Sequence, residues 1–223
     1  MVFLRMGVFM TDNITVNTQS SIRIEAGKQV IYIDPIMIEE ERHDADLIFL
    51  THNHYDHFEP ETINRLNRDV MTMVVAPKGM FDQIGKETDV EYNNVVPLEP
   101  GDKMQLNGFP IEAVHAYNIG KEFHPKENNW LGYVLTINGQ RIYICGDMDA
   151  TPEAKAVKCD IVLVPCGGKY TMDPQEAAAF VNEIKPKIAI PTHYGSIVGT
   201  PEDGDKFAKL VDQGIEVVLK LAF

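Results

Sequence analysis

DLIFLTHNHYDHFEP, residues 46–60, places an apolar run directly before a dense group of polar side chains. The run LIFL is typical of a short buried strand. After Thr51, the next six residues include one aspartate and three of the chain's seven histidines: His52, His54, Asp56 and His57. Because side chains alternate along an extended segment, His52 and His54 can point the same way. Imidazole and carboxylate together suit Zn, Fe, Mn or Ni, so the pattern favours a metal site over a His-rich polar loop.

Three later strands repeat this arrangement. IEAVHAYN carries His115 at the end of an apolar run, RIYICGDMD has Asp147 directly after a strand, and KIAIPTHYG has His193 directly after another. Catalytic groups in layered α/β folds tend to lie at strand ends. A single histidine at a strand end is more often a hydrogen-bonded core residue. Together with the first group, however, these three residues predict further metal ligands.

The rest of the chain predicts strand hairpins first and alternating strands and helices later. The predicted strands are residues 14–18, 21–26, 29–34, 47–50, 71–76, 103–108, 110–117, 131–137, 141–147, 160–168, 187–195 and 216–223, and the predicted helices are residues 60–68, 77–85, 151–157, 173–185 and 201–214. The helix at 173–185 has the strongest start signal, with Asp173 as N-cap, Pro174 in the first turn and Glu176 closing a capping box. This order predicts two sheets with helices outside them. We see no linker or repeat, and predict a single domain, residues 1–223.

Composition limits the classes of partner. The 223 residues are 44% hydrophobic and 24% charged, as in an ordinary globular protein, and the formal net charge is −13. The acidic surplus argues against nonspecific nucleic-acid binding, which depends on cationic contacts to phosphates. No apolar run approaches the roughly 18 residues needed to cross a bilayer, so no membrane partner is expected. A small-molecule substrate is expected instead, and the sequence says nothing of the oligomeric state.

The cysteines and the N-terminus bear on location. Cys145, Cys159 and Cys166 have no paired spacing and lie in or beside apolar runs, which predicts buried, reduced thiols in a reducing compartment. We therefore expect a cytoplasmic protein. The start MVFLRMGVFM is apolar but is interrupted by Arg5 and lacks a small-residue cleavage site, so we interpret it as an ordinary N-terminus. Whether Met1 or a later methionine is the true start stays open.

The motifs taken together resemble a known superfamily. The set H-x-H-x-D-H, a distant histidine, Gly-Asp after a strand and a histidine after a late strand is similar to that of the metallo-β-lactamase-fold superfamily. The likeness runs from NITVNTQSSIRIEAGKQVIYIDP to the last strand. Within the superfamily, THNHYDH, CGDMD and VPCGGKYTMDPQEAAAFVNEIKPKIAIPTHYG resemble the small bacterial and archaeal metal-dependent hydrolases related to ascorbate-6-phosphate lactonase. The resemblance implies an α/β fold, the αββα four-layer sandwich.

The same resemblance implies two divalent ions per chain. The implied ligands are His52, His54 and His115 for the first ion, Asp56, His57 and His193 for the second, and Asp147 as a bridge between them. His54 stands where the diiron oxidoreductases of the superfamily usually have Glu, which favours a hydrolase. Lactonase-like relatives often prefer Mn²⁺, so we expect Zn²⁺ with Mn²⁺ as the alternative.

Such a centre predicts hydrolytic chemistry. Two ions about 3.5–4 Å apart can share a water and lower its pKa toward ~7, which supplies a metal-bound hydroxide for attack on a carbonyl or phosphoryl centre. Asp56 is the candidate catalytic residue that orients this group and carries its proton. For Asp149, an acceptor role behind a ligand histidine and a plain surface acid both stay open.

Substrate contacts are harder to infer. The polar loop after His115, residues 116–130, contains His124 and Lys126, which would contact an anionic substrate, although a solvated loop fits as well. Further candidates follow two later strands: Gly167 and Gly168, whose backbone N–H groups could approach a ligand, and Tyr194, which could stabilise an oxyanion or make a structural hydrogen bond.

The function that we predict is a dinuclear metal-dependent hydrolase of a small-molecule ester, lactone or phosphoester. A phosphodiesterase or nuclease is the alternative among enzymes, and the acidic charge argues against it. A non-catalytic metal-binding or sensing protein on the same fold is the alternative outside enzymes, and the complete ligand set argues against that. Fold alone does not fix the substrate.

Overall fold

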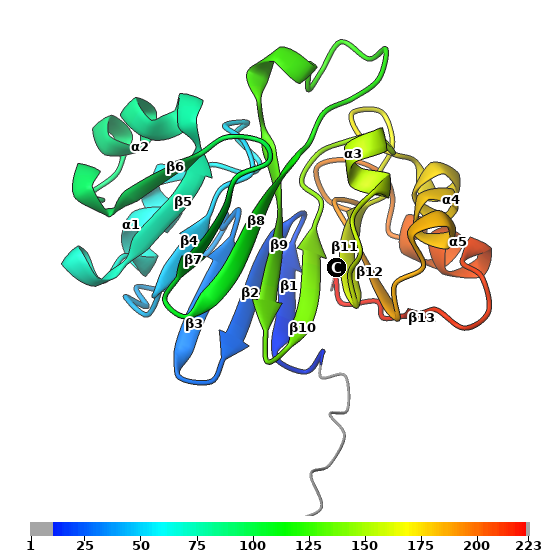
Figure 1. The fold of residues 1–223 in the computed structure, drawn as a ribbon, viewed down its shortest axis with the longest axis horizontal. Helices are drawn as coiled ribbons and strands as arrows, with labels where there is room; N and C mark the ends of the chain where they lie inside the picture. Colours follow the sequence, from blue (N-terminus) through cyan, green and yellow to red (C-terminus); the bar gives the residue numbers. More distant parts are fainter. Residues whose placement is uncertain (1–10, 222–223) are drawn as a thin grey trace, which may run out of the picture.

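The computed structural model describes residues 11–221, in which two β-sheets pack face to face and helices cover their outer sides (Figure 1). The predicted αββα sandwich is therefore confirmed. The predicted ordinary N-terminus at residues 1–10 lies outside the described residues. In the part of the chain that the structure describes, no helix is long and apolar enough to cross a membrane.

The first sheet contains the N-terminal half of the chain. Its strand order is β1 (Ile14–Thr18), β2 (Ser21–Ala26), β3 (Gln29–Ile33), β4 (Leu47–Phe49), β5 (Met73–Pro77) and β6 (Val95–Leu98). The pairs β1–β2 and β2–β3 are antiparallel, whereas β3 to β6 pair in parallel. The outer face packs against α1 (Pro60–Leu66) and α2 (Phe81–Glu87). Short 3-10 turns lie at Asp69–Met71, Lys78–Met80 and Tyr92–Asn94.

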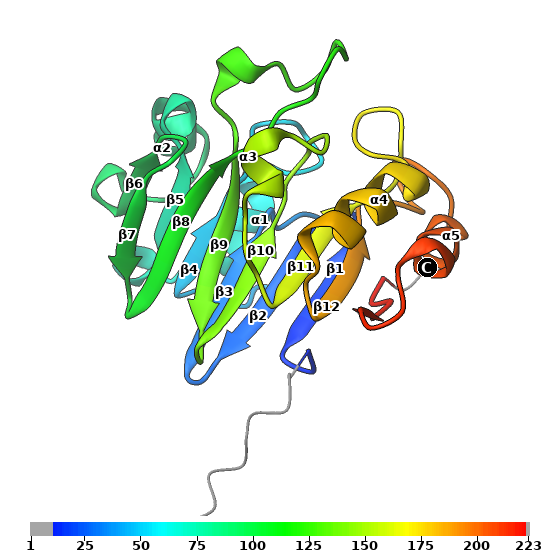
Figure 2. The ribbon, with the colours of Figure 1, turned by 45° about the vertical axis from the view of Figure 1, so that its right-hand side comes forward.

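The second sheet contains the C-terminal half. Its strand order is β13 (Glu216–Val217), β12 (Ile188–Thr192), β11 (Ile161–Pro165), β10 (Gln140–Ile144), β9 (Leu131–Ile137), β8 (Phe109–His115) and β7 (Lys103–Leu106). A 3-10 turn at Lys126–Asn128 lies between β8 and β9, and α3 (Pro152–Lys155), α4 (Pro174–Ile184) and α5 (Asp203–Leu210) lie on the outer side (Figure 2). The capping box of α4 is confirmed, since the Glu176 amide donates to Asp173 at 2.8 Å and the Asp173 amide to Glu176 at 3.0 Å.

Alternation along the buried strands separates three apolar layers. In β4, Leu47 and Phe49 face the core between the sheets, while Ile48 faces the helices outside the first sheet. In β11, Leu163 faces the same central core and Val164 faces the outer helices. Such strands are apolar on both faces because both sides of the sheet are covered, which is why their runs in the sequence are continuous.

Several elements differ from prediction, among them β11 and β12, which end at Pro165 and Thr192 instead of residues 168 and 195. β6 was not predicted, because Val95–Leu98 is short and contains Pro97, which is tolerated here at the sheet edge. α5 and β13 are shorter than predicted, at Asp203–Leu210 and Glu216–Val217.

The cysteines are free as predicted, with Cys145 and Cys166 buried, but Cys159 is only half-buried.

Candidate metal centre

The predicted histidine cluster lies at the ends of strands from both sheets. His52 to His57 form the turn after β4, and the amides of His57 and Phe58 both donate to the His54 carbonyl at 2.9 Å. Backbone bonds across the sandwich hold this region together: Leu131 donates to the Thr51 carbonyl at 3.1 Å, and His193 donates to the Gln19 carbonyl at 2.8 Å. The site is thus built on rigid elements of both sheets.

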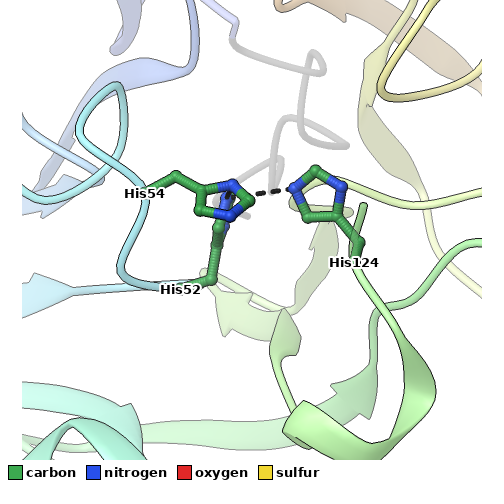
Figure 3. Close-up of side chains that lie close together, drawn as sticks. All are labelled: His52, His54 and His124. Carbon is green, nitrogen blue, oxygen red and sulfur yellow. Dashed lines mark hydrogen bonds between the residues drawn. The ribbon is translucent and has the colours of Figure 1, made fainter. Parts of the chain in front are cut away.

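One potential metal-binding group joins the turn after β4 to the loop after β8 (Figure 3). It consists of His52, His54 and His124, each offering a ring nitrogen. Nε2 of His52 lies 3.1 Å from Nδ1 of His54 and 3.3 Å from Nε2 of His124. Each of these three nitrogens can present a lone pair in the neutral imidazole, so their convergence suits a cation in their midst.

His124 takes the place predicted for His115. The His115 ring packs edge-on to Tyr117 and its Nε2 lies 2.9 Å from the Lys126 carbonyl, on a surface outside the histidine group. The structure therefore places His124, and not His115, beside His52 and His54. The chain leaves β8, turns through the loop and returns at His124, which is buried and has a positive φ of 60°. His124, which the sequence predicted to contact the substrate, is instead a candidate metal ligand.

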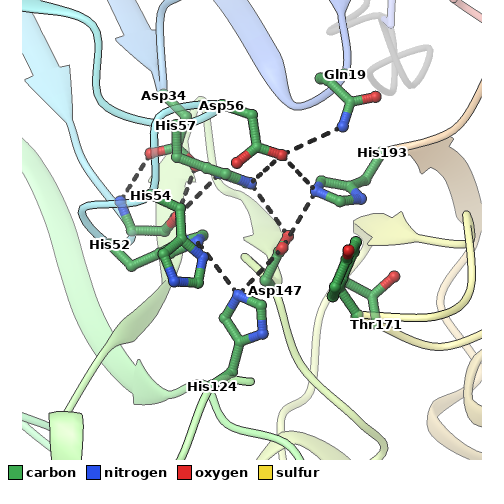
Figure 4. Close-up of polar contacts among 12 residues, drawn as sticks. Gln19, Asp34, His52, His54, Asp56, His57, His124, Asp147, Thr171 and His193 are labelled. Carbon is green, nitrogen blue, oxygen red and sulfur yellow. Dashed lines mark hydrogen bonds and ion pairs between the residues drawn. The ribbon is translucent and has the colours of Figure 1, made fainter. Parts of the chain in front are cut away.

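Two further groups share His57 and lie around Asp147 (Figure 4). The groups are His52, His57 and Asp147, and Asp56, His57 and His193. Oδ1 of Asp147 lies 3.3 Å from Nε2 of His57, and Oδ2 lies 3.1 Å from Nε2 of His193. The same Oδ2 lies 3.3 Å from Nε2 of His124. One carboxylate therefore faces both halves of the cluster.

Several polar atoms at this centre make no hydrogen bond of good geometry among the described residues, although some of them lie within ion-pair distance of one another. They are Nε2 of His57, Oδ1 of Asp147, and both ring nitrogens of His193. All three residues are buried, and an unsatisfied buried polar group costs about 1–3 kcal/mol. A divalent cation would satisfy the atoms that face the centre, and imidazole with carboxylate is a donor set for zinc-like ions. The residues present therefore fit a metal.

The electrostatics favour cation binding in the same place. Burial alone lowers the pKa of His193, but the carboxylates of Asp147 and Asp56 outweigh it and raise that pKa to about 9. Burial likewise opposes ionisation of Asp147, yet the neighbouring His193 and His57 hold its pKa well below the usual value. The carboxylates thus stabilise positive charge on the histidines, and a metal ion would replace these protons on binding.

Asp34 orients a ligand histidine, and the sequence analysis missed it. Its buried carboxylate follows β3 and accepts from the Thr51 amide at 2.7 Å, from the Thr51 hydroxyl at 2.6 Å and from Nδ1 of His57 at 2.7 Å. This leaves Nε2 of His57 directed at the centre. The signal was present, because Asp34 ends the apolar run QVIYID in the same way that Asp147 ends RIYIC.

Asp149 does not act behind a histidine. Its carboxylate accepts from the Ile119 amide at 2.8 Å and from the Lys121 ammonium at 2.5 Å. Lys121 also donates to the Thr171 carbonyl at 2.8 Å. Asp149 and Lys121, called here the Lys121 clamp, therefore hold the loop that carries His124.

Gln19 is a second residue that sequence reasoning missed, because a glutamine in a turn between two strands gives no signal. Its Nε2 lies 3.4 Å from Oδ2 of Asp56, and its Oε1 accepts from the Ser196 hydroxyl at 3.0 Å. Since its carbonyl also accepts from the His193 amide, this buried turn contacts both Asp56 and His193.

A pocket of about 230 Å³ opens onto the cluster. Its lining consists of His54, Tyr55, Asp56, Phe123, His124, Asp147, Tyr170, His193, Ile197 and Val198. Lys126 is absent from this lining and instead pairs with Glu153 at 2.8 Å and with the Tyr117 hydroxyl at 3.2 Å. The predicted role of Lys126 in binding substrate is therefore not supported by its position.

The other predicted substrate contacts are also absent from the described lining. Tyr194 is buried in the outer apolar layer with its hydroxyl against Gly204. Gly167 allows close backbone approach, because a Cβ there would collide with the His193 carbonyl. Gly168 has a φ of 72° and donates its amide to Met172 at 3.0 Å. These residues shape the chain around His193 and do not face the pocket.

The layers and the His/Asp groups at the strand ends are those of a metallo-β-lactamase fold. The profile described as "Beta-lactamase superfamily domain" matches residues 13–193, and the chain belongs to this superfamily, among its UPF0173 metal-dependent hydrolases. A protein of that name from Staphylococcus carnosus is 30% identical over 219 residues, covering 91% of this chain and 94% of the relative. One from Thermoplasma acidophilum is 30% identical over 195 residues, covering 82% and 84%.

Solved structures agree with this assignment. A metal-dependent hydrolase from Parabacteroides distasonis has 31% sequence identity and a TM-score of 0.76, covering 93% of this chain and 91% of that one. The predictions of the fold and of a metal-dependent hydrolase are confirmed at this level. The comparisons do not extend to the resemblance to ascorbate-6-phosphate lactonase, to the number and kind of ions or to the substrate class.

Proposed function

We propose that this chain is a dinuclear metal-dependent hydrolase of a small-molecule ester, lactone or phosphoester. The observation that supports two ions is the position of Asp147, whose carboxylate lies near ligands proposed for both: His124 for one ion, and His57 and His193 for the other. One ion would be held by His52, His54 and His124, and the other by Asp56, His57 and His193, with Asp147 between them. Zn²⁺ is the metal we expect, with Mn²⁺ as the alternative.

The ions would activate water and polarise the bond to be cleaved, and the chain's own residues would position the reactants. Asp56 lines the pocket and its Oδ2 lies 3.3 Å from Nε2 of His193. The Gln19 amide, at 3.4 Å from the same oxygen, restrains it. Asp56 is therefore placed both to bind the second ion and to accept a proton from the attacking water.

The alternatives fit the site less well. A nuclease or phosphodiesterase would need cationic contacts to a polyanion, whereas the described lining of the pocket includes no Lys or Arg and the net charge is −13. If the chain were a sensing protein with the same ligands, it would bind metal without turnover.

We also propose a relation to ascorbate-6-phosphate lactonase. We propose a cytoplasmic location as well, and the three unpaired cysteines support it.

Metal analysis together with turnover tests this function. Protein reloaded with Zn²⁺ or Mn²⁺ should contain about two ions per chain by elemental analysis and should hydrolyse members of an ester, lactone and phosphodiester panel. Asp147→Ala should lose at least one ion and its activity while keeping the fold by circular dichroism. Less than one ion per chain in the parent would overturn the dinuclear proposal. Two ions without turnover on any of these would favour the sensing alternative.

A further inference from the structure

Part of the lining of the metal-site pocket is apolar and is called here the apolar wall. It is formed by Phe123 from the loop after β8, by Tyr170 from the loop after β11, and by Ile197 and Val198 from the loop after β12. The rings of Phe123 and Tyr170 meet edge to face with centroids 4.7 Å apart and planes at 80°. Three separate loops therefore contribute apolar groups to one surface.

Two aromatic rings at this pocket are exposed. Tyr55 is 76% exposed and Phe123 is 44% exposed, although both line a concave site. Large apolar side chains that face a pocket and remain accessible lose solvent contact only when a ligand covers them. The Phe123 ring also lies 6.4 Å from the His54 ring, so a group resting on Phe123 would lie next to the candidate metal ligands.

Cations near this wall have other partners. Lys121 is held by Asp149 and the Thr171 carbonyl, and Lys126 by Glu153. Lys169 lies over the Tyr170 ring, with Nζ 4.6 Å from the centroid, but does not line the pocket. An anionic substrate tail would therefore meet no Lys or Arg among the described lining residues. This argues against the anionic substrate that the loop sequence suggested.

The volume limits the size of the ligand. About 230 Å³ is below the roughly 300–1,000 Å³ of sites for drug-sized ligands and above the ~150 Å³ of a cavity that binds benzene. The pocket fits one ring together with a reacting group. A disaccharide or a nucleotide would extend beyond it.

Building on the proposed function, we propose that the substrate is a small neutral molecule whose non-reacting part is one uncharged ring, held against Phe123, Tyr170, Ile197 and Val198. The ring would exclude water from the reacting bond, and the metal ligands that line the same pocket would face that bond. Specificity would thus come from apolar contact on one side and metal chemistry on the other.

Binding without turnover tests this inference separately from hydrolysis. Benzamide, a neutral ring, and 6-phosphogluconate, a phosphorylated sugar acid, would each be titrated into metal-loaded protein by calorimetry. Benzamide should bind more tightly, and Phe123→Ala and Ile197→Ala should each weaken it by about tenfold. Ile119→Ala is the matched control, because Ile119 lies on the same loop, is 58% exposed and does not line the pocket.

The outcomes separate this inference from the proposed function. Benzamide binding that Phe123→Ala weakens would support the apolar wall even if no ester is hydrolysed. Tighter binding of 6-phosphogluconate that Lys169→Ala abolishes would overturn the inference and leave the hydrolase proposal intact. Equal benzamide affinity in the parent, Phe123→Ala and Ile197→Ala proteins would also overturn it.

Discussion

Nδ1 of His57 lies 2.7 Å from Oδ2 of Asp34, and both side chains are buried. On its other edge, Nε2 of the same ring lies 3.3 Å from Oδ1 of Asp147. Burial lowers the pKa of His57, but the carboxylates of Asp147 and Asp34 outweigh it and raise that pKa well above its usual value. An ion that binds at Nε2 would displace the proton there, while the Nδ1–H donates to Asp34. A carboxylate behind a ligand histidine fixes the ring and increases its basicity.

The first prediction concerns this pair. Asp34→Asn preserves the size of the side chain but removes the charge behind His57, so metal affinity should fall by about 10–100-fold. Competition titration with a chromophoric chelator measures the change. The control is Asp46→Asn, because Asp46 precedes β4 at the opposite end from the cluster and accepts from the Val30 amide. Equal losses in both variants would indicate a general loss of stability.

The second prediction separates His115, which ends β8, from His124 in the loop that follows. His124→Ala should reduce the metal content by about one ion per chain, because it removes a nitrogen within 3.3 Å of Nε2 of His52. His115→Ala should retain the metal content of the parent, since its ring bonds to the Lys126 carbonyl. Elemental analysis after dialysis measures the metal content of both variants. Loss of metal in His115→Ala but not in His124→Ala would restore His115 as the ligand.

Positions within or directly after apolar strands could be predicted from the sequence. His52, Asp147 and His193 lie where continuous apolar runs end, and parallel strands bring such ends together. His124 could not be placed in this way, because a loop has no periodicity that fixes which side chain returns to the sheet. The same limit explains Phe123 and Ile197, which belong to loops and define the pocket only after folding.

The third prediction compares two lysines of the loop between β8 and β9. Lys121→Ala breaks the Lys121 clamp to Asp149 and Thr171, so the segment that carries His124 should become more mobile and bind metal less tightly. Lys126→Ala removes contacts with Glu153 and with the hydroxyl and ring of Tyr117, and all three residues are absent from the described lining of the metal-site pocket. It should leave metal affinity and kcat/KM within about twofold of the parent. Hydrogen exchange of residues 117–124 provides the second measurement. A tenfold loss of kcat/KM in Lys126→Ala would reinstate it as a substrate contact.

The fourth prediction concerns the thiols. Burial raises the pKa of Cys159 to about 12 and that of Cys145 well above its usual value. Because the thiolate is the reactive form, the native protein should react slowly with Ellman's reagent at pH 8, and rising pH should accelerate the reaction only as it approaches these pKa values. Unfolding in guanidinium should release three rapid equivalents. Rapid native reaction would show that these thiols are accessible.

The last prediction tests the close packing behind His193. A Cβ at Gly167 would collide with the His193 carbonyl and lie 2.9 Å from Cγ2 of Val198. Backbone cannot yield as a flexible side chain does, so Gly167→Ala should displace the loop after β12. Overpacking of this kind costs about 1–3 kcal/mol, which denaturant unfolding would detect. Because the displaced loop carries His193, metal affinity should fall as well. Gly79→Ala is the control, since a Cβ there meets nothing within 4 Å. Unchanged stability and metal binding in Gly167→Ala would show that the strand ends can separate without disturbing the centre.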